Sequence, residues 1–159
     1  MILLKFKKEI KGDAAASGYE GQIKLTSTQF SASRSVGVPS GSAARETGAP
    51  TFSEVHCSKD FDIASTELFM QSVSGASLEE ASLTYLQTDG EGGPQVYLVV
   101  TLTDPIVTSY SHSGMMGDKP SESFALNFTK ISLAYTQYTG EAAVKASPKG
   151  WNLLEQKAA

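Results

Sequence analysis

The sequence predicts a mainly β fold: a barrel of long, bent strands with one α-helix outside it and one long extended loop. Hydrophobic residues make up 40% of the chain, and Ser, Thr and Gly are abundant, a mixture typical of sheets with polar faces. Several segments alternate apolar and polar residues with the period of a strand, and one segment has the spacing and caps of a helix. The chain has 159 residues and is expected to form a single domain over residues 1–159.

The first strand is expected at Ile2–Phe6, followed by a loop punctuated by glycines. Residues 21–33, GQIKLTSTQFSAS, have strand character but are polar on both faces beyond Leu25. Part of this strand must therefore face water or another subunit. Residues 37–50, GVPSGSAARETGAP, have no periodicity and predict the long extended loop. Residues 51–62 alternate again and predict another strand.

The helix is expected in ASTELFMQSVSG, residues 64–75. Ser65 can cap its N-terminus, Glu67 lies in the first turn and Gly75 supplies a left-handed stop. The spacing predicts one buried stripe that packs against a sheet. This stripe comprises Ala64, Leu68, Phe69 and Val73.

Two strands are expected in residues 77–89 and 94–110, joined by a glycine-rich turn, with Pro105 marking a bend or an edge. The stretch 121–138, SESFALNFTKISLAYTQY, then changes phase. Its apolar residues lie at even positions as far as Phe128 and at odd positions from Ile131. A bulge near Thr129 and Lys130 would explain this change and let one long strand turn a barrel corner. The predicted core comprises Leu25, Leu68, Phe69, Val73, Leu83, Leu98, Val100, Phe124, Leu126, Phe128 and Trp151.

Charge and cysteine content argue against several functions. The formal charge of −4 and the pI near 5.2 provide no basic surface for nucleic acid. Cys57 is the single cysteine, so neither an intrachain disulfide nor a thiolate zinc cluster can form, and a buried strand position is expected for it. The N-terminus has only four apolar residues before Lys5, too few for a signal peptide or a membrane span. Folding in the cytoplasm is therefore expected.

No catalytic constellation is evident. The two histidines, His56 and His112, are isolated and are expected to be ordinary strand or loop residues. Ser40 is one position off the spacing of a nucleophile elbow. Glu79 and Glu80 are neighbours that would point to opposite faces of a strand, the wrong arrangement for paired acid and base. The chain is therefore not expected to be an enzyme, and no catalytic residue, metal site or cofactor is predicted.

Five stretches in order carry a family resemblance: LLKFKKEIKG with GYEGQIKLTS, FSEVHCSKDFDIASTELFMQSVSG, SESFALNFTKISLAYTQY and KGWNLLEQ. With them the chain resembles the haemolysin-coregulated protein (Hcp) family, the inner-tube proteins of bacterial type VI secretion systems. The resemblance implies a β-barrel of two antiparallel sheets with a flanking helix. It also implies a homohexameric ring with a central hole, rings that stack into a tube, and effector proteins carried in the lumen.

The resemblance also implies partners and a location. The partners would be other copies of the chain, the contractile sheath, the spike protein at the tip and effector proteins, with no nucleic acid and no membrane insertion. The protein would reside in the bacterial cytoplasm before assembly and leave through the type VI system without a signal peptide. Unpaired sheet edges, satisfied by a head-to-tail neighbour, would close the ring.

Two sets of site residues are expected. One small polar row of residues 26–31 would line the lumen, with the row Ser27, Gln29 and Ser31 preferred; the alternative is that these are ordinary solvated strand residues. The extended loop would reach the next ring through Val38, Pro39, Ser40, Arg45 and Glu46.

A different class of protein is also compatible with the pattern. A monomeric β-sandwich module that binds carbohydrate or another ligand would use Tyr97, Tyr110 and Tyr135 as an aromatic platform. A small hydrolase is disfavoured because nucleophile and base geometry are missing.

Overall fold

The computed structural model describes residues 1–38, 41, 44–89, 93–139 and 142–159. Its largest sheet has eight strands in the order β14-β13-β11-β8-β7-β1-β2, with β12 paired to β11. These strands are β1 (Ile2–Phe6), β2 (Ile23–Leu25), β7 (Glu80–Asp89), β8 (Gly93–Thr103), β11 (Lys130–Thr139), β12 (Ala142–Lys145), β13 (Lys149–Asn152) and β14 (Lys157–Ala158).

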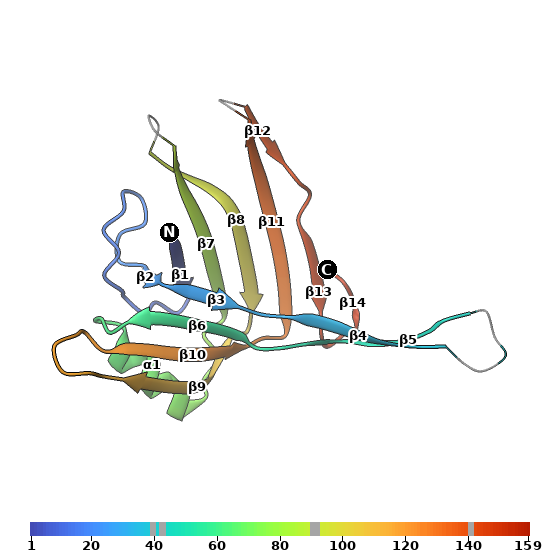
Figure 1. Cartoon of the computed structure of the whole chain (residues 1–159), viewed down its shortest axis with the longest axis horizontal. Coiled ribbons are helices and arrows are strands. Elements are labelled where there is room, and N and C mark those ends of the chain that lie inside the picture. The colour runs from blue at the N-terminus through green and yellow to red at the C-terminus, as the bar shows by residue number, and fades with distance from the viewer. Residues whose placement is uncertain (39–40, 42–43, 90–92, 140–141) are drawn as a thin grey trace.

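A second sheet of four strands crosses in front of the first (Figure 1). Its strands, in spatial order, are β3 (Ser27–Gln29), β6 (Val55–Asp60), β10 (Ser121–Asn127) and β9 (Ile106–Ser113). The helix α1 (Ser65–Ser74) lies beside β9. Strands β4 (Ala32–Gly37) and β5 (Glu46–Phe52) pair with each other and extend away from the body as a two-stranded arm.

The predicted fold class is confirmed: the chain is mainly β, with antiparallel sheets and one helix in the described residues. Over the same residues, no strand ladder joins the two large sheets into a closed barrel. The predicted loop 37–50 is wrong in part, because Glu46–Phe52 pairs with Ala32–Gly37. Backbone pairing and a hydrogen bond between the Ser33 and Thr51 hydroxyls join the two strands, whose sequences lack the apolar periodicity that would predict them.

The phase change in residues 121–138 has a different cause from the predicted bulge. β10 ends at Asn127 in the four-stranded sheet, and β11 begins at Lys130 in the eight-stranded sheet. The apolar core lies between these sheets, so the two strands face it from opposite sides. Even positions of β10 therefore point into the core, as does Ile131 at the start of β11, whereas Leu133 and Tyr135 on the same side of β11 are exposed. The predicted bend at Pro105 is confirmed. The chain passes there from β8 in the eight-stranded sheet to β9 in the four-stranded sheet, and Asp104 has a φ of 50°.

The core prediction is confirmed for most residues. Leu25, Leu68, Leu83, Val100, Phe124, Leu126 and Phe128 are buried, whereas Leu98 and Trp151 are half-buried. Phe69 and Val73 were predicted to be buried but are 49% and 68% exposed. The helix lies at the sheet edge and packs only the stripe that contains Ala64 and Leu68 into the core, leaving its adjacent face uncovered.

For the two ends of α1, the prediction is confirmed at the C-terminus and wrong at the N-terminus. Gly75 has a left-handed φ of 64°, and its N–H donates to the Gln71 carbonyl. Ser65 is not the N-cap. The N-cap residue is Ala64, which has no side-chain capping bond, and the Ala64 N–H donates to Asp62 Oδ1 at 2.8 Å.

Candidate functional site

Serines form a row across the outer face of the four-stranded sheet. Ser27 on β3 pairs with Ser58 on β6, and Ser58 pairs with Ser123 on β10. Ser123 pairs in turn with Ser111 on β9, and their hydroxyl oxygens are 2.8 Å apart. Ser27, Ser111 and Ser123 are exposed. Every strand of this sheet therefore contributes a small hydroxyl to one surface.

The neighbouring rows extend this surface, which we name the serine face. It comprises Ser27, Gln29, His56, Ser58, Asp60, Ser109, Ser111, Ser113, Ser121 and Ser123. Most members are short and uncharged. The only ionisable side chains in this set belong to His56 and Asp60. The serine face is thus rich in hydroxyl groups, with little fixed charge.

Of the three residues in the predicted row, Ser27 and Gln29 lie on the serine face. Thr28 points the other way, where its hydroxyl is 2.5 Å from that of Tyr85. Ser31 lies between β3 and β4, exposed but outside the ladder, and its N–H donates to Ser53 Oγ at 2.8 Å. The structure therefore brings two of the three predicted residues together.

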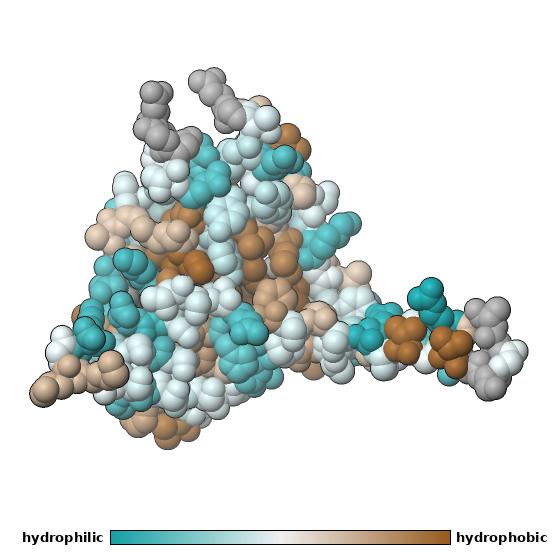
Figure 2. Space-filling model, in the orientation of Figure 1, coloured by the Kyte–Doolittle hydropathy of each residue, from teal (hydrophilic) through white to brown (hydrophobic). Residues whose placement is uncertain are grey.

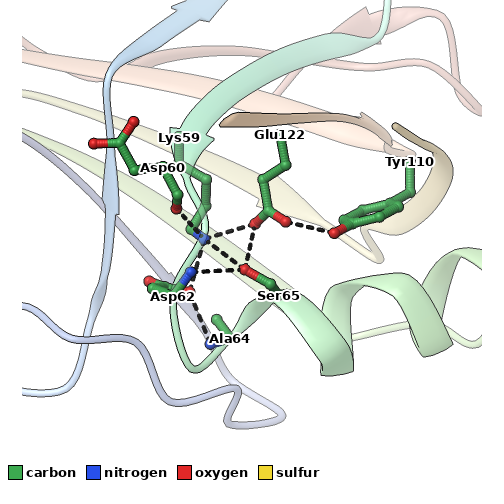
Figure 3. Close-up of polar contacts among 7 residues, drawn as sticks. All are labelled: Lys59, Asp60, Asp62, Ala64, Ser65, Tyr110 and Glu122. Carbon is green, nitrogen blue, oxygen red and sulfur yellow. Dashed lines mark hydrogen bonds and ion pairs between the residues drawn. The ribbon is translucent and has the colours of Figure 1, made fainter. Parts of the chain in front are cut away.

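A buried polar network lies behind this sheet (Figure 3). Lys59 Nζ is 2.6 Å from Glu122 Oε1 and 2.7 Å from Asp62 Oδ1, and all three side chains are almost fully buried. Ser65 Oγ donates to the same Glu122 oxygen at 2.9 Å, and the Tyr110 hydroxyl donates to Glu122 Oε2 at 2.5 Å. Burial, together with this bond to Glu122, raises the pKa of the Tyr110 phenol. The network ties β6, β9, β10 and α1 to one another.

Beside the network, α1 and β9 form an apolar groove. Its volume is about 600 Å³, and its lining includes Phe61, Phe69, Met70, Tyr110 and His112. The Phe69 and Tyr110 rings meet edge to face at 5.9 Å. We name the groove together with the exposed Phe69, Met70 and Val73 the helix patch.

A second apolar surface lies at the opposite edge of the four-stranded sheet. Tyr85, Leu98 and Tyr135 are cross-strand neighbours and form one row across the eight-stranded sheet. The hydrogen bond between Tyr85 and Thr28 places this row next to β3. Beyond that level the eight-stranded sheet is uncovered, and Figure 2 shows hydrophobic residues over β8 and β11. We name Leu98, Leu133, Tyr135 and Val144 the sheet patch; the last three are 37%, 49% and 60% exposed.

The arm holds the described part of the second predicted set. Val38, Arg45 and Glu46 are exposed at its outer end. Pro39 and Ser40 lie outside the described residues. The arm strands make no contribution to the core until Phe52, which packs edge to face on Phe128 at 6.5 Å. Within the described ranges, β4 and β5 pair with each other and pack no apolar side chain into the core before Phe52.

The residues that were expected to have no catalytic role lie in separate environments. His56 and His112 point to opposite faces of the four-stranded sheet. Cys57 is fully buried, and burial raises the pKa of its thiol to about 12. Glu79 forms an exposed ion pair with Lys7 at 3.0 Å. Within the ranges that the structure describes, no group of three or more His, Cys, Asp or Glu side chains could hold a metal.

The tyrosines proposed as a ligand platform do not share one surface. Tyr110 lies in the four-stranded sheet and is engaged by Phe69 and Glu122. Tyr97 and Tyr135 lie in the eight-stranded sheet, where the Tyr97 ring packs on that of Tyr85 at 6.2 Å. The arrangement offers no single aromatic platform.

Comparison with known proteins identifies the family. The family profile described as "Type VI secretion system effector, Hcp" matches residues 3–135. The chain belongs to the Hcp family. It is accordingly a type VI secretion tube protein. No curated protein sequence matches it significantly.

Solved structures share the Hcp fold over almost the whole chain. A structure described as a type six secretion system protein is 23% identical, covers 99% of this chain and 98% of its own, and superposes with a TM-score of 0.91. Hcp1 from Salmonella typhimurium is 22% identical, with coverages of 99% and 97% and a TM-score of 0.80. A type VI secretion system effector from Yersinia pestis is 17% identical, with coverages of 96% and 99% and a TM-score of 0.71. At these identities the likeness shows the shared fold.

Sequence reasoning missed most of the serine face and the whole buried network. The period-two serines at 109, 111 and 113 and at 121 and 123 carried a usable signal, because such spacing marks one face of a strand. Lys59 and Glu122 carried none. They are 63 residues apart, and charged residues in strands are ordinarily solvated.

Proposed function

We propose that residues 1–159 form a single structural domain, that six copies close into a ring, and that rings stack into a tube whose lumen carries effectors. The observation that carries this proposal is the placement of two exposed apolar patches at opposite edges of one sheet. The helix patch lies at the β9 edge and the sheet patch lies beyond the β3 edge. Because the patches differ, they fit a head-to-tail contact between copies.

The strand edges support the same arrangement. β3 and β9 are the outer strands of the four-stranded sheet, so each presents backbone donors and acceptors with no strand partner on one side in the described residues. If the β9 edge of one copy meets the β3 edge of the next, the helix patch is carried toward the sheet patch. A repeated rotation of this kind closes into a ring.

The apolar area that the proposed contact would cover is large enough to stabilise it. Phe69 is 49% exposed, which leaves roughly 100 Å² of an aromatic side chain in water. Covering that area would contribute about 2.5 kcal/mol at roughly 25 cal/mol per Å². Tyr135, with the same exposure, doubles this contribution from the other side.

We assign the serine face to the lumen. Small hydroxyl side chains can exchange hydrogen bonds with many protein surfaces, yet they offer no apolar anchor of the kind that dominates stable interfaces. Ser27 and Gln29 lie on this face and would contact effectors, with Ser31 at its margin. Such a surface would hold a cargo weakly enough to release it.

The remaining parts of the proposal concern transport. The arm, with Val38, Arg45 and Glu46 in its described part, would contact the adjoining ring, and Pro39 and Ser40 belong to the same segment. The contractile sheath and the tip spike would be the other partners. The protein would assemble in the bacterial cytoplasm and leave through the type VI system without a signal peptide. The ten-residue α1 is far shorter than a bilayer span, and the described residues hold no other helix.

The test is the mass of the purified protein by size-exclusion chromatography with light scattering. We expect the mass of a hexamer and annular particles by negative-stain microscopy. Val73→Asp, which buries an unpaired charge in the proposed contact, should give folded monomers. Met116→Asp changes an equally apolar, fully exposed residue away from both patches and should leave the hexamer intact. A wild-type monomer at high concentration, or a Val73→Asp hexamer, would contradict the proposal.

A further inference from the structure

The walls of the apolar groove in the helix patch come from two different elements. One wall is α1, which contributes Phe69 and Met70, and the other is β9, which contributes Tyr110 and His112. The Phe69 and Tyr110 rings meet edge to face at 5.9 Å. Because a helix satisfies its backbone groups within itself, side chains must set its distance from a neighbouring strand.

One buried carboxylate is bonded to both walls (Figure 3). Glu122 Oε1 accepts from the hydroxyl of Ser65, the first residue of α1, at 2.9 Å. Glu122 Oε2 accepts from the Tyr110 hydroxyl on β9 at 2.5 Å. Phe69 follows Ser65 by four residues and so lies on the same side of the helix. The two oxygens belong to one planar group, so α1 and β9 cannot shift independently while both bonds are made.

The carboxylate itself is held from behind. Lys59 Nζ lies 2.6 Å from Glu122 Oε1, and it also donates to Asp62 Oδ1 at 2.7 Å and to the Asp60 carbonyl at 2.8 Å. The side chains of Lys59 and Glu122 are both 0% exposed, so neither can move without breaking several bonds. The position of Glu122 is therefore fixed by β6 and the turn that follows it.

Net stability is a weak explanation for such an arrangement. A buried ion pair is often no more stabilising than apolar side chains of the same volume, because desolvation offsets the attraction. A fully bonded network instead specifies one geometry. Here that geometry includes the groove, because Tyr110 is both a partner of Glu122 and a wall of the helix patch. A surface whose side chains are already fixed loses less conformational entropy when a second copy binds.

We infer that Glu122 is a positioning residue for assembly: through Ser65 and Tyr110 it sets the groove that receives the sheet patch of a second copy. The inference rests on the ring proposed above. Glu122 is buried and would not touch the neighbouring copy, so it acts on the contact only through the residues it binds. Ring closure thus depends on a charge behind the contact as well as on the apolar residues within it.

Tyr110→Phe tests this inference, because it removes the bond to Glu122 and retains the aromatic ring. Tyr138→Phe is the matched control: it also removes one phenol hydrogen bond, to the Val96 carbonyl at 2.9 Å, at a position outside the groove. The readout is the concentration at which half of the chains are in rings, measured by light scattering over a dilution series in low urea. It should rise about 10-fold for Tyr110→Phe and stay within about 2-fold of wild type for Tyr138→Phe. Equal shifts in the two variants would indicate a general loss of stability and would overturn the inference.

Methyl NMR of the four methionines reads the groove itself. Met70 lines the groove together with Phe69 and Tyr110, so its ¹³C-methyl resonance responds to the position of these rings. Ser65→Ala removes the bond between α1 and Glu122. This variant should displace the Met70 resonance and leave that of the fully exposed Met116 unchanged. A Met70 resonance that does not move would overturn the inference.

The double variant Ser65→Ala with Tyr110→Phe shows whether one carboxylate serves both walls. On a logarithmic scale, its loss of assembly should be smaller than the sum of the single losses, because either change already releases one wall from the other. Additive losses would refute Glu122 as the common anchor. Wild-type protein separates the two proposals: a wild-type monomer refutes the ring and the inference with it, whereas wild-type hexamers whose assembly is unchanged by Tyr110→Phe refute the inference alone.

Discussion

Replacing Lys59 with Met should destabilise the folded protein severely. The side chains of Lys59, Glu122 and Asp62 are 0%, 0% and 4% exposed, so water cannot replace the lost ammonium group. Met retains most of the length and apolar volume of the lysine stem. The substitution therefore removes one charge and its hydrogen bonds while leaving the packing largely intact.

The magnitude follows from the contacts. The ammonium group donates to Glu122 at 2.6 Å and to Asp62 at 2.7 Å. Hydrogen bonds to charged groups contribute about 1.5–3 kcal/mol each, and removing one partner of a buried ion pair costs about 3–5 kcal/mol. We expect a loss of about 4 kcal/mol, a large share of the roughly 5–15 kcal/mol by which native domains are stable.

Urea denaturation followed by fluorescence measures this loss. The variants are compared at one low protein concentration, because assembly would make stability depend on concentration. Lys7→Met is the matched control: it makes the same substitution in the exposed pair with Glu79, and little change is expected there. Equal effects of Lys59→Met and Lys7→Met would refute the reasoning. A double variant, Lys59→Met with Glu122→Leu, should lose less than the sum of the single losses, and strict additivity would show that the two groups are not coupled.

Phe128→Ala should cost about 3–5 kcal/mol in the same denaturation assay, because Phe128 is 4% exposed and packs on Phe52; an unchanged midpoint would contradict its place in the core. Gly12→Ala should cost about 1–3 kcal/mol, because a Cβ there would lie 2.4 Å from the Gln22 carbonyl oxygen; a neutral effect would mean that this loop can shift. The pKa of the Cys57 thiol is raised by burial from 9.0 to about 12, so the folded state keeps a proton that the unfolded chain releases above pH 9. Between those values stability is lost as pH rises, and wild type should lose about 1.4 kcal/mol more than Cys57→Ala on going from pH 8 to about pH 10; parallel pH profiles would refute this.

The strands with clean alternation were predictable because burial on one face leaves a period-two pattern in the sequence. Phe124, Leu126 and Phe128 show that pattern, and all three are buried. The break at Pro105 was predictable for a local reason as well, since proline has no backbone donor for a ladder. Local rules also gave the left-handed stop of α1 at Gly75.

Predictions failed where a residue's surroundings come from distant parts of the chain. Phe69 and Val73 are apolar, and the helical spacing alone could not decide which stripe the sheet edge would cover. The arm strand Glu46–Phe52 has Gly and Pro and no apolar alternation, and only its partner β4 makes it a strand. The phase change after Phe128 was visible, but a bulge and a crossing between two sheets produce the same pattern in a single sequence.

By itself, the sequence determined the class of fold, most of the core, the burial of Cys57 and the resemblance to the Hcp family. These depend on composition, on residue periods and on local backbone preferences. The tertiary structure decided which surfaces the chain presents: the serine face, the helix patch and the sheet patch. Each surface is assembled from strands far apart along the chain, and the register of their pairing, which brings Ser27, Ser58, Ser123 and Ser111 into one row, exists only once the sheets have formed.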